Sequence, residues 1–276
     1  MRDIEPSRRA PHQAPAELPP EPPLYRLRLN TRVGALQLDL ELALTARWTV
    51  IFGPSGSGKS TILRAICGLL PHAPRTTSIS GFSTGVASSG APVEWDHQRH
   101  HVAPHLRELA YAPQGAVLFP HMSARQNIAF PSQAQRGRSA RHSPADQPDS
   151  NAAIIDQAIQ CFQLEALSQR RPADLSGGER QRVNLARAFA VPHPRLILLD
   201  EPFTGIDRAL RHTLLPRMQE RAAQLGAPVL SVTHDVEEAL MLGAEVIRVE
   251  QGRIIDQGPA ARVLAEERSR MLQILL

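Results

Sequence analysis

The stretch WTVIFGPSGSGKST, at Trp48–Thr61, sets the architecture of the chain because it joins an apolar segment to a glycine-rich loop. The segment Trp48–Phe52 has no polar face, which is typical of a strand covered on both sides in a parallel sheet. The loop matches the phosphate-binding pattern G-x-x-x-x-G-K-S/T, and apolar residues at helical spacing begin at Ile62. A strand, this loop and a helix in that order predict an α/β core that binds phosphate.

The glycine-rich loop, here called the P-loop, supplies groups that suit a polyphosphate and its metal ion. Its glycines allow the backbone N–H groups and the helix N-terminus to point at the anion. We expect Lys59 to reach the β- and γ-phosphates and the Ser60 hydroxyl to bind Mg²⁺. The alternative is an ordinary glycine turn with an exposed lysine. The nucleotide-binding residues predicted for the P-loop are Gly53, Pro54, Ser55, Gly56, Ser57, Gly58, Lys59, Ser60 and Thr61.

An acid pair, Asp200 and Glu201, follows the apolar segment LILL at Leu196–Leu199. The carboxyl end of a strand is where α/β sheets bind their ligands. We expect Asp200 to hold Mg²⁺, mostly through water, and Glu201 to polarise the water that attacks the γ-phosphate. Without a P-loop in the same chain, a helix cap or a solvated loop would explain such a pair equally well.

A second loop with glycines, LSGGERQR, occupies residues 175–182. Ser176 followed three residues later by Glu179 is the pattern of a capping box, which predicts a helix start with free N–H groups. Gly177 and Gly178 permit a close approach of the backbone to an anion. The loop therefore predicts a second anion site, with a simple capped surface helix as the alternative.

The motifs together resemble those of the ATPase subunits of ABC transporters. The resemblance is carried by GPSGSGKST, Gln114 in YAPQ, LSGGERQR, LILLDEP, Asp207 in TGID and His234 in SVTHD, over about Leu24 to Leu264. It implies an ATPase that binds ATP and Mg²⁺. It also implies that two copies of the chain face each other head-to-tail, with each ATP held between one P-loop and the LSGGE loop of the other copy.

The resemblance implies a role for each matching residue. Gln114 would contact Mg²⁺ and the attacking water, and His234 would hydrogen-bond the γ-phosphate and orient Glu201. Asp207 would lie at the dimer interface, where TGID departs from the more common SALD. The predicted catalytic residues are Glu201, His234, Gln114 and Lys59; the metal-binding residues are Ser60, Gln114 and Asp200; and Ser176, Gly177, Gly178, Glu179 and Asp207 complete the nucleotide site.

Adenine recognition departs from the family pattern. The family usually stacks the base on an aromatic residue, and the matching stretch Thr31–Ala35 has none. Tyr25 lies too early in the sequence to take its place. The choice of ATP over other nucleoside triphosphates therefore follows from the resemblance alone.

The chain divides into a tail and one domain. Residues 1–23 are rich in proline and lack periodicity, which predicts a disordered tail, and residues 24–276 predict a single ABC ATPase domain. Within that domain, alternating apolar residues predict two antiparallel strands at Leu24–Asn30 and Ala35–Leu44. Strand patterns are absent from residues 119–174, which we predict to form an inserted helical subdomain.

The rest of the domain alternates strand and helix patterns. Further strands are predicted at Leu196–Asp200, Val229–Thr233 and Glu245–Glu250, and helices around Asp207–Leu225 and Val236–Leu242. The fold class is therefore α/β, a P-loop NTPase core with a parallel sheet, an antiparallel β subdomain and the helical insert. Inside the insert, Pro131–Ser150 is expected to be an exposed loop and Asn151–Leu167 a helix.

Composition narrows the classes of function. Aromatic residues make up 4% of 276 residues and no dense basic block occurs, so we expect no nucleic-acid partner. The apolar runs fall short of the roughly 18–20 residues that a membrane span needs. Prolines follow Arg8 and Arg9 where a signal sequence would be apolar. With the resemblance, this predicts a peripheral protein at the cytoplasmic face of the inner membrane.

The partners follow from the resemblance. The chain would couple to an integral membrane permease and, through it, to a substrate-binding protein. Val117, Leu118, Phe119 and Met122 would line a groove for a short permease helix, or would be core residues. The cargo suggested by IFGPSGSGKST and FPHMSARQNIAF is molybdate or a related oxyanion, with polyamine, sulfate or phosphonate as alternatives. A soluble ABC-type ATPase acting on nucleic acid or ribosomes is the alternative function.

Cysteines and histidines are candidate metal ligands. Cys67 and Cys161 lie in apolar helical patterns and are expected to be buried and unpaired. Four histidines crowd one segment, but no ligand spacing accompanies them, so a solvated loop is expected there. These histidines are His97, His100, His101 and His105.

Overall fold

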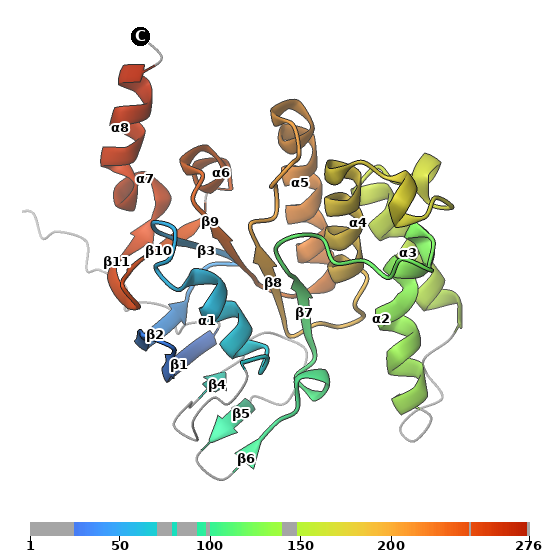
Figure 1. Ribbon diagram of the computed structural model, residues 1–276, viewed down its shortest axis with the longest axis horizontal. Coiled ribbons are helices and arrows are strands. Elements are labelled where there is room, and N and C mark those ends of the chain that lie inside the picture. The colour runs from blue at the N-terminus through green and yellow to red at the C-terminus, as the bar shows by residue number, and fades with distance from the viewer. Residues whose placement is uncertain are drawn as a thin grey trace, which may run out of the picture.

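The computed structural model describes residues 25–70, 79–81, 93–97, 100–139, 148–242 and 244–274 (Figure 1). The proposed tail at residues 1–23 lies outside these ranges. The strands are β1 (Tyr25–Val33), β2 (Leu36–Leu44), β3 (Trp48–Phe52), β4 (Ile79–Gly81), β5 (Val93–His97), β6 (His100–His101), β7 (Leu109–Ala112), β8 (Leu196–Asp200), β9 (Val229–Thr233), β10 (Glu245–Glu250) and β11 (Arg253–Pro259). The helices are α1 (Lys59–Ile66), α2 (Ala124–Ser139), α3 (Pro148–Cys161), α4 (Gly177–Phe189), α5 (Arg208–Leu225), α6 (Val236–Met241), α7 (Ala260–Val263) and α8 (Ala265–Ile274).

A six-stranded sheet forms the centre of the molecule. Its strand order is β11-β10-β3-β9-β8-β7, and every pair is parallel except β10 and β11. All residues of β3, β8 and β9 are buried, and for β3 this agrees with the absence of a polar face at Trp48–Phe52. The loops after β3, β8 and β9 leave the sheet at the same edge because parallel strands share a direction.

The two faces of this sheet pack against different layers. Successive side chains of a strand point to opposite faces. Ile51 of β3 belongs to the apolar cluster that includes residues of α1, β1 and β2, whereas Val50 belongs to the cluster that includes residues of α2, α3, α4 and α5. The helices α1 and α4, which begin at the two glycine loops, therefore cover opposite faces of the sheet.

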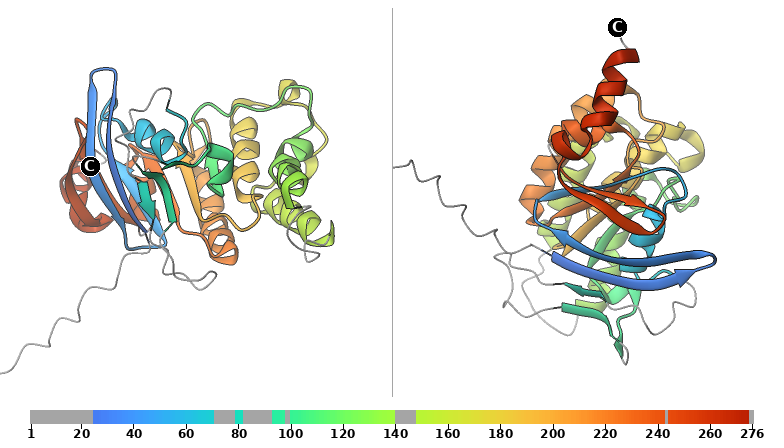
Figure 2. Two further views of the ribbon diagram at one scale, coloured as in Figure 1. Left: turned by 90° about the horizontal axis from the view of Figure 1, so that it is seen from below. Right: turned by 90° about the vertical axis from the view of Figure 1, so that its left-hand side faces the viewer.

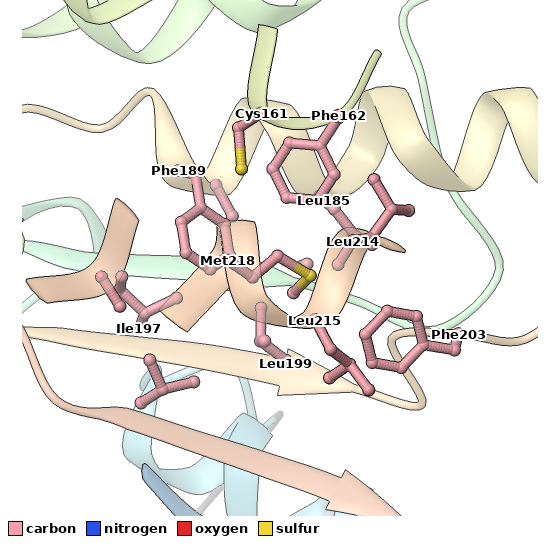
Figure 3. Packing of buried hydrophobic residues seen from close by; sticks show 14 of the residues in the cluster. Cys161, Phe162, Leu185, Phe189, Ile197, Leu199, Phe203, Leu214, Leu215 and Met218 are labelled. Carbon is pink, nitrogen blue, oxygen red and sulfur yellow. The ribbon is translucent and has the colours of Figure 1, made fainter. Parts of the chain in front are cut away.

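The face that carries α4 and α5 has a tightly packed apolar cluster (Figure 3). The rings of Phe162 and Phe189 lie 5.4 Å apart between their centroids, and Met218 fills the space beside them. Phe203, two residues after Glu201, also points into this cluster with 3% of its surface exposed. The loop that carries Glu201 is thus anchored to the core.

The antiparallel subdomain predicted near the N-terminus is confirmed. β1 and β2 pair along their full lengths, with Tyr25 opposite Leu44 and Val33 opposite Leu36. They form a long ribbon on the side of the molecule away from α2 and α3 (Figure 2). The buried residues of β2 alternate with exposed ones, as the period-two pattern requires.

The helical region contains α2, α3 and α4, but the expected loop at Pro131–Ser150 is wrong in part. Helix α2 continues through Pro131 to Ser139, and α3 already begins at Pro148. The Ser132 hydroxyl donates to the carbonyl of Ala190 at 3.2 Å. This contact with the end of α4 stabilises α2, although the polar composition of its second half had favoured a loop. The helix expected at Asn151–Leu167 ends early, because Gln163 adopts a φ of 52° and a 3-10 turn follows.

The solvated loop predicted for the histidine segment is wrong in part, because His97, His100 and His101 lie in strands. His97 ends β5, and it pairs with His100 in the short strand β6. His105 is exposed in a 3-10 turn, Pro104–Leu106. Backbone pairing with Ile79–Gly81 of β4 outweighs the polar composition of these strands.

Both cysteines are buried and unpaired, as predicted. Burial raises the pKa of the Cys67 thiol to about 12 and that of Cys161 to about 12, so both are protonated at neutral pH.

Among the helices of the described ranges, none has the length and apolar character to cross a membrane.

Candidate functional site

The P-loop connects β3 to α1 in the way that the sequence predicts. A side-chain carbon at Gly53 would lie 2.2 Å from the carbonyl oxygen of Val249, so only glycine fits there. Gly58 has a φ of 100° and caps α1 with no side-chain hydrogen bond. The first N–H groups of α1 are consequently left for another acceptor.

Lys59 folds back over its own loop. Its Nζ atom donates to the carbonyls of Gly53 at 2.8 Å and of Pro54 at 2.9 Å. Burial lowers the pKa of the ammonium group, and the nearby carboxylates of Glu201 and Asp200 oppose this effect. The loop thus concentrates one positive charge beside a set of backbone donors, which suits a polyphosphate.

Ser60 and Asp200 meet although they are far apart in the sequence. The Ser60 hydroxyl donates to Oδ1 of Asp200 at 2.8 Å. Asp200 is 1% exposed, and burial raises the pKa of its carboxyl group. A hydroxyl and a carboxylate are the hard oxygen donors that Mg²⁺ prefers, so the pair fits the predicted metal site.

The P-loop also contains a buried polar atom without a partner. Ser57 Oγ is buried and makes no hydrogen bond within the described part of the chain. Buried hydroxyls are normally satisfied, so such an atom calls for a missing partner. A phosphate oxygen cradled by the loop would supply one, which supports the fit of the site to a nucleotide.

Glu201 and His234 form a second pair at the ends of neighbouring strands. His234 Nδ1 lies 2.9 Å from Oε1 of Glu201. Glu201 has a φ of 50°, an unfavourable conformation for a residue with a side chain. Its N–H donates to the carbonyl of Val232 at 3.0 Å, which ties the turn to β9.

The loop at residues 175–182, here called the signature loop, has the predicted capping box. The Glu179 N–H donates to Ser176 Oγ at 3.2 Å, and the Ser176 N–H donates to Oε2 of Glu179 at 2.7 Å. The latter hydrogen bond lowers the pKa of the Glu179 carboxyl group. Ser176 and Gly177 are exposed, and a side-chain carbon at Gly177 would meet nothing within 4 Å. Helix α4 therefore starts at an open surface.

Among the described residues, two predicted site residues form no hydrogen bond with these pairs. Asp207 is exposed, and its side chain caps α5 by accepting from the N–H of Leu210 at 2.9 Å. Gln114 is exposed in the loop after β7 and, within the described ranges, makes no hydrogen bond to Ser60 or Asp200. Contacts and charge join Lys59, Ser60, Asp200, Glu201 and His234. Gln114 follows β7, which pairs in parallel with β8, and so leaves the sheet at the same edge as Asp200.

The residues proposed for a permease groove are partly exposed. Val117 has 69% of its surface exposed, whereas Leu118 packs against the main apolar cluster. The ring centroids of Phe119 and Phe130 are 4.5 Å apart, and the Arg187 guanidinium lies over the Phe119 ring. Leu118 is thus partly a core residue, whereas Val117 is exposed and available for the proposed contact.

Sequence reasoning missed several residues that support the site. Tyr111 donates to Oδ2 of Asp200 at 3.5 Å, and Thr233 donates to Glu238 at 2.9 Å. Glu238 is 3% exposed, and burial raises the pKa of its carboxyl group to about 8. Gln181, on α4, contacts the turn after β8. The sequence signal that could have pointed to these residues is a polar side chain within an otherwise apolar, buried segment, as at Gln181.

The sequence profile of the ABC transporter family matches residues 37–204, which include the P-loop, the signature loop and the acid pair. The chain belongs to this family. Its predicted fold is confirmed by a dimeric post-hydrolysis state of the ATP-binding cassette MJ0796 bound to ADP and Pi, with a TM-score of 0.67 at 22% identity. That comparison covers 86% of this chain and 98% of the other. CbiO1 from Clostridium perfringens, part of the transporter complex cbiONQ, gives a TM-score of 0.65 at 22% identity and covers 93% and 96%.

Curated relatives with higher identity are molybdenum import ATP-binding proteins called ModC. The protein from Pseudomonas aeruginosa is 36% identical over 243 residues, and that from Thiobacillus denitrificans is 37% identical over 240 residues. Each alignment covers 87% of this chain. The chain spans only 61% and 60% of the lengths of these two relatives.

Proposed function

We propose that this chain binds and hydrolyses ATP as the energy-coupling subunit of an importer. The observation that carries the proposal is the convergence of Lys59, Ser60, Asp200 and the Glu201–His234 pair at one edge of the sheet. Residues 24–276 would form the single ATPase domain, because both apolar clusters are built on the same central sheet.

The chemistry follows from these side chains. The P-loop N–H groups and Lys59 would bind the phosphates and offset their negative charge. Mg²⁺, when bound by Ser60, Asp200 and Gln114, would neutralise charge on the β- and γ-phosphate oxygens. Glu201 would accept a hydrogen bond from the attacking water and align it with the γ-phosphate. His234, bonded to Glu201 through Nδ1, would keep that carboxylate in place and present its other ring nitrogen to the phosphate.

The second anion site would act on another copy of the chain. The signature loop starts a helix on the opposite face of the sheet from α1, and its residues Ser176 and Gly177 are exposed. We propose a head-to-tail dimer in which each ATP lies between one P-loop and the partner's signature loop. Asp207, exposed at the start of α5, would lie at the seam.

The membrane role rests on the relatives. We propose a peripheral position at the cytoplasmic face of the inner membrane, on a separate permease that receives substrate from a binding protein. The ModC relatives favour molybdate or a related oxyanion as the cargo. Cells that lack this chain should accumulate less molybdenum when molybdate is limiting. Unchanged molybdenum content would remove this cargo.

The ATPase proposal is tested with Glu201→Gln. The substitution keeps the size of the side chain but removes the charge that polarises water, so turnover should fall at least about 100-fold while ATP still binds. The trapped complex should migrate as a dimer in size-exclusion chromatography with ATP and as a monomer without it. A variant that hydrolyses ATP at the wild-type rate, or stays monomeric with saturating ATP, would contradict the proposal.

A further inference from the structure

Helix α4, which begins in the signature loop, also hydrogen-bonds to the loops that follow β7 and β8. Gln181 Nε2 donates to the carbonyl of Pro202 at 2.9 Å and, more weakly, to that of Glu201 at 3.4 Å. One turn further along α4, Asn184 Nδ2 donates to the carbonyl of Pro113 at 2.9 Å, directly before Gln114. Both amide side chains are buried, with 3% and 0% of their surfaces exposed. Their spacing of three residues places them on one face of the helix.

The turn that Gln181 holds is strained. Glu201 has a φ of 50°, and a residue with a side chain keeps such a backbone only where its surroundings impose it. On its N–H side, Glu201 is fixed by the carbonyl of Val232. On its carbonyl side, the side-chain donor is Gln181. Gln181 therefore supplies one of the restraints that hold the Glu201 backbone in place.

The first turn of α4 touches the same loop by direct packing. A side-chain carbon at Gly178 would lie 2.6 Å from the carbonyl oxygen of Gly205. Gly205 and Glu201 belong to the same hydrogen-bonded turn, because the Thr204 N–H donates to the Glu201 carbonyl at 3.3 Å. A displacement of α4 would thus reach Glu201 both through the Gln181 amide and through the Gly178–Gly205 contact.

We propose that Gln181 is a positioning residue that couples the signature loop to the Glu201 turn of its own chain. The inference rests on the proposed function, in which the N-terminus of α4 binds the ATP of the partner. A phosphate that fixes α4 would then also fix Glu201, which acts on the ATP held by the P-loop of the same chain. The two ATP sites of the dimer would be linked through α4 of each subunit.

The test is Gln181→Met, which keeps the length and helix propensity of the side chain but cannot donate a hydrogen bond. Small displacements of a catalytic group slow a reaction strongly, so kcat should fall about 10-fold or more. The KM for ATP and the equilibrium binding of nucleotide to Lys59's loop should change less than about 2-fold, because Gln181 does not touch the P-loop. This split between kcat and KM would not arise from general destabilisation.

The matched control is Gln219→Met on α5. Gln219 makes the same kind of hydrogen bond, from Nε2 to the carbonyl of Leu242 at 2.9 Å, away from the residues of the site. Its kcat should stay within about 2-fold of wild type. Both proteins should show cooperative thermal unfolding, and Gln181→Leu, which also cannot donate a hydrogen bond, should repeat the loss of kcat.

Each result bears on the inference in a defined way. Equal kcat for Gln181→Met and wild type, or an equal loss in Gln219→Met, would overturn it. If neither Gln181 variant folds, the residue is structural and the inference is also overturned. A wild-type protein without ATPase activity, or a Glu201→Gln protein that never dimerises, would instead count against the proposed function.

Discussion

The P-loop and the signature loop both place glycines and serines before a helix, yet they are built in opposite ways. The P-loop is closed by its own chain, since Lys59 bonds two of its carbonyls and Gly53 and Gly58 leave no room for side chains. The first turn of the signature loop is held by its capping box, and Gly177 faces open space. One loop is closed by residues of its own chain, whereas the start of the other is open at the surface.

The contrast explains why one chain carries two such loops. A loop that surrounds a polyphosphate needs buried donors and a cation from its own subunit. A loop that closes over a ligand held elsewhere needs an exposed helix start, which the capping box orders before any partner arrives. Substitutions in the P-loop should therefore affect chemistry, and those at the exposed start of the signature loop, Ser176 and Gly177, should affect association or local stability.

The largest effect is expected for Lys59→Ala. The substitution removes the cation of the P-loop and the bonds to the carbonyls of Gly53 and Pro54. We expect ATP hydrolysis to fall at least about 100-fold, since loss of one charged donor to a transition state has effects of this size. A steady-state phosphate-release assay measures it. Activity within 10-fold of wild type would contradict the claim that the P-loop lysine is needed for ATP hydrolysis.

A smaller effect separates the two glycines of the signature loop. Gly178→Ala places a methyl group 2.6 Å from the Gly205 carbonyl, so we expect a loss of about 1–3 kcal/mol in the free energy of unfolding. Gly177→Ala meets nothing within 4 Å and should be neutral or stabilising by up to about 1 kcal/mol. Urea unfolding of both proteins measures the difference. The reverse order would show that the signature loop packs differently from this account.

The capping box itself should contribute about 1 kcal/mol. Ser176→Ala removes the hydroxyl that accepts from the Glu179 N–H, and loss of such an N-cap typically costs this amount. Chemical denaturation gives the value, with Ser168→Ala as a control because that hydroxyl bonds an exposed 3-10 turn. Equal stability of Ser176→Ala and wild type would contradict the claim that the capping box orders the start of α4.

The smallest effect is the pH dependence of the capping box. The Ser176 N–H lowers the pKa of Glu179, so its contribution to stability is present above the ordinary glutamate pKa and is lost as the pH falls below it. The stability difference between wild type and Glu179→Ala should therefore shrink between about pH 6 and about pH 3. Because Glu179 is largely solvated, the change should be smaller than that of Ser176→Ala. A difference that grows with acidity would contradict the assignment.

The sequence predicted those parts of the fold and site that depend on local patterns. The P-loop, the antiparallel ribbon and the capping box each rest on spacing within a few residues, and all three are confirmed. The continuation of α2 through Pro131 could not be predicted, because the Ser132 bond to Ala190 exists only in the folded chain. The contact of Gln181 with Pro202 is of the same kind.

The chain also provides a clean background for the decisive measurement. Its native cysteines, Cys67 and Cys161, are buried and protonated, so they should not compete with introduced thiols. Ser55 is exposed on the P-loop, and Gly177 is exposed on the signature loop. Cysteines at both positions, in the Glu201→Gln protein, report directly on whether the two kinds of loop meet across a dimer.

With ATP and a short bifunctional thiol reagent, the protein with Ser55→Cys and Gly177→Cys should form a covalent dimer, visible on a denaturing gel, that is absent without nucleotide. Each single-cysteine protein should remain monomeric under the same conditions. A double-cysteine protein that stays monomeric with saturating ATP, while still binding it, would contradict the claim that one copy's open loop closes the other copy's site.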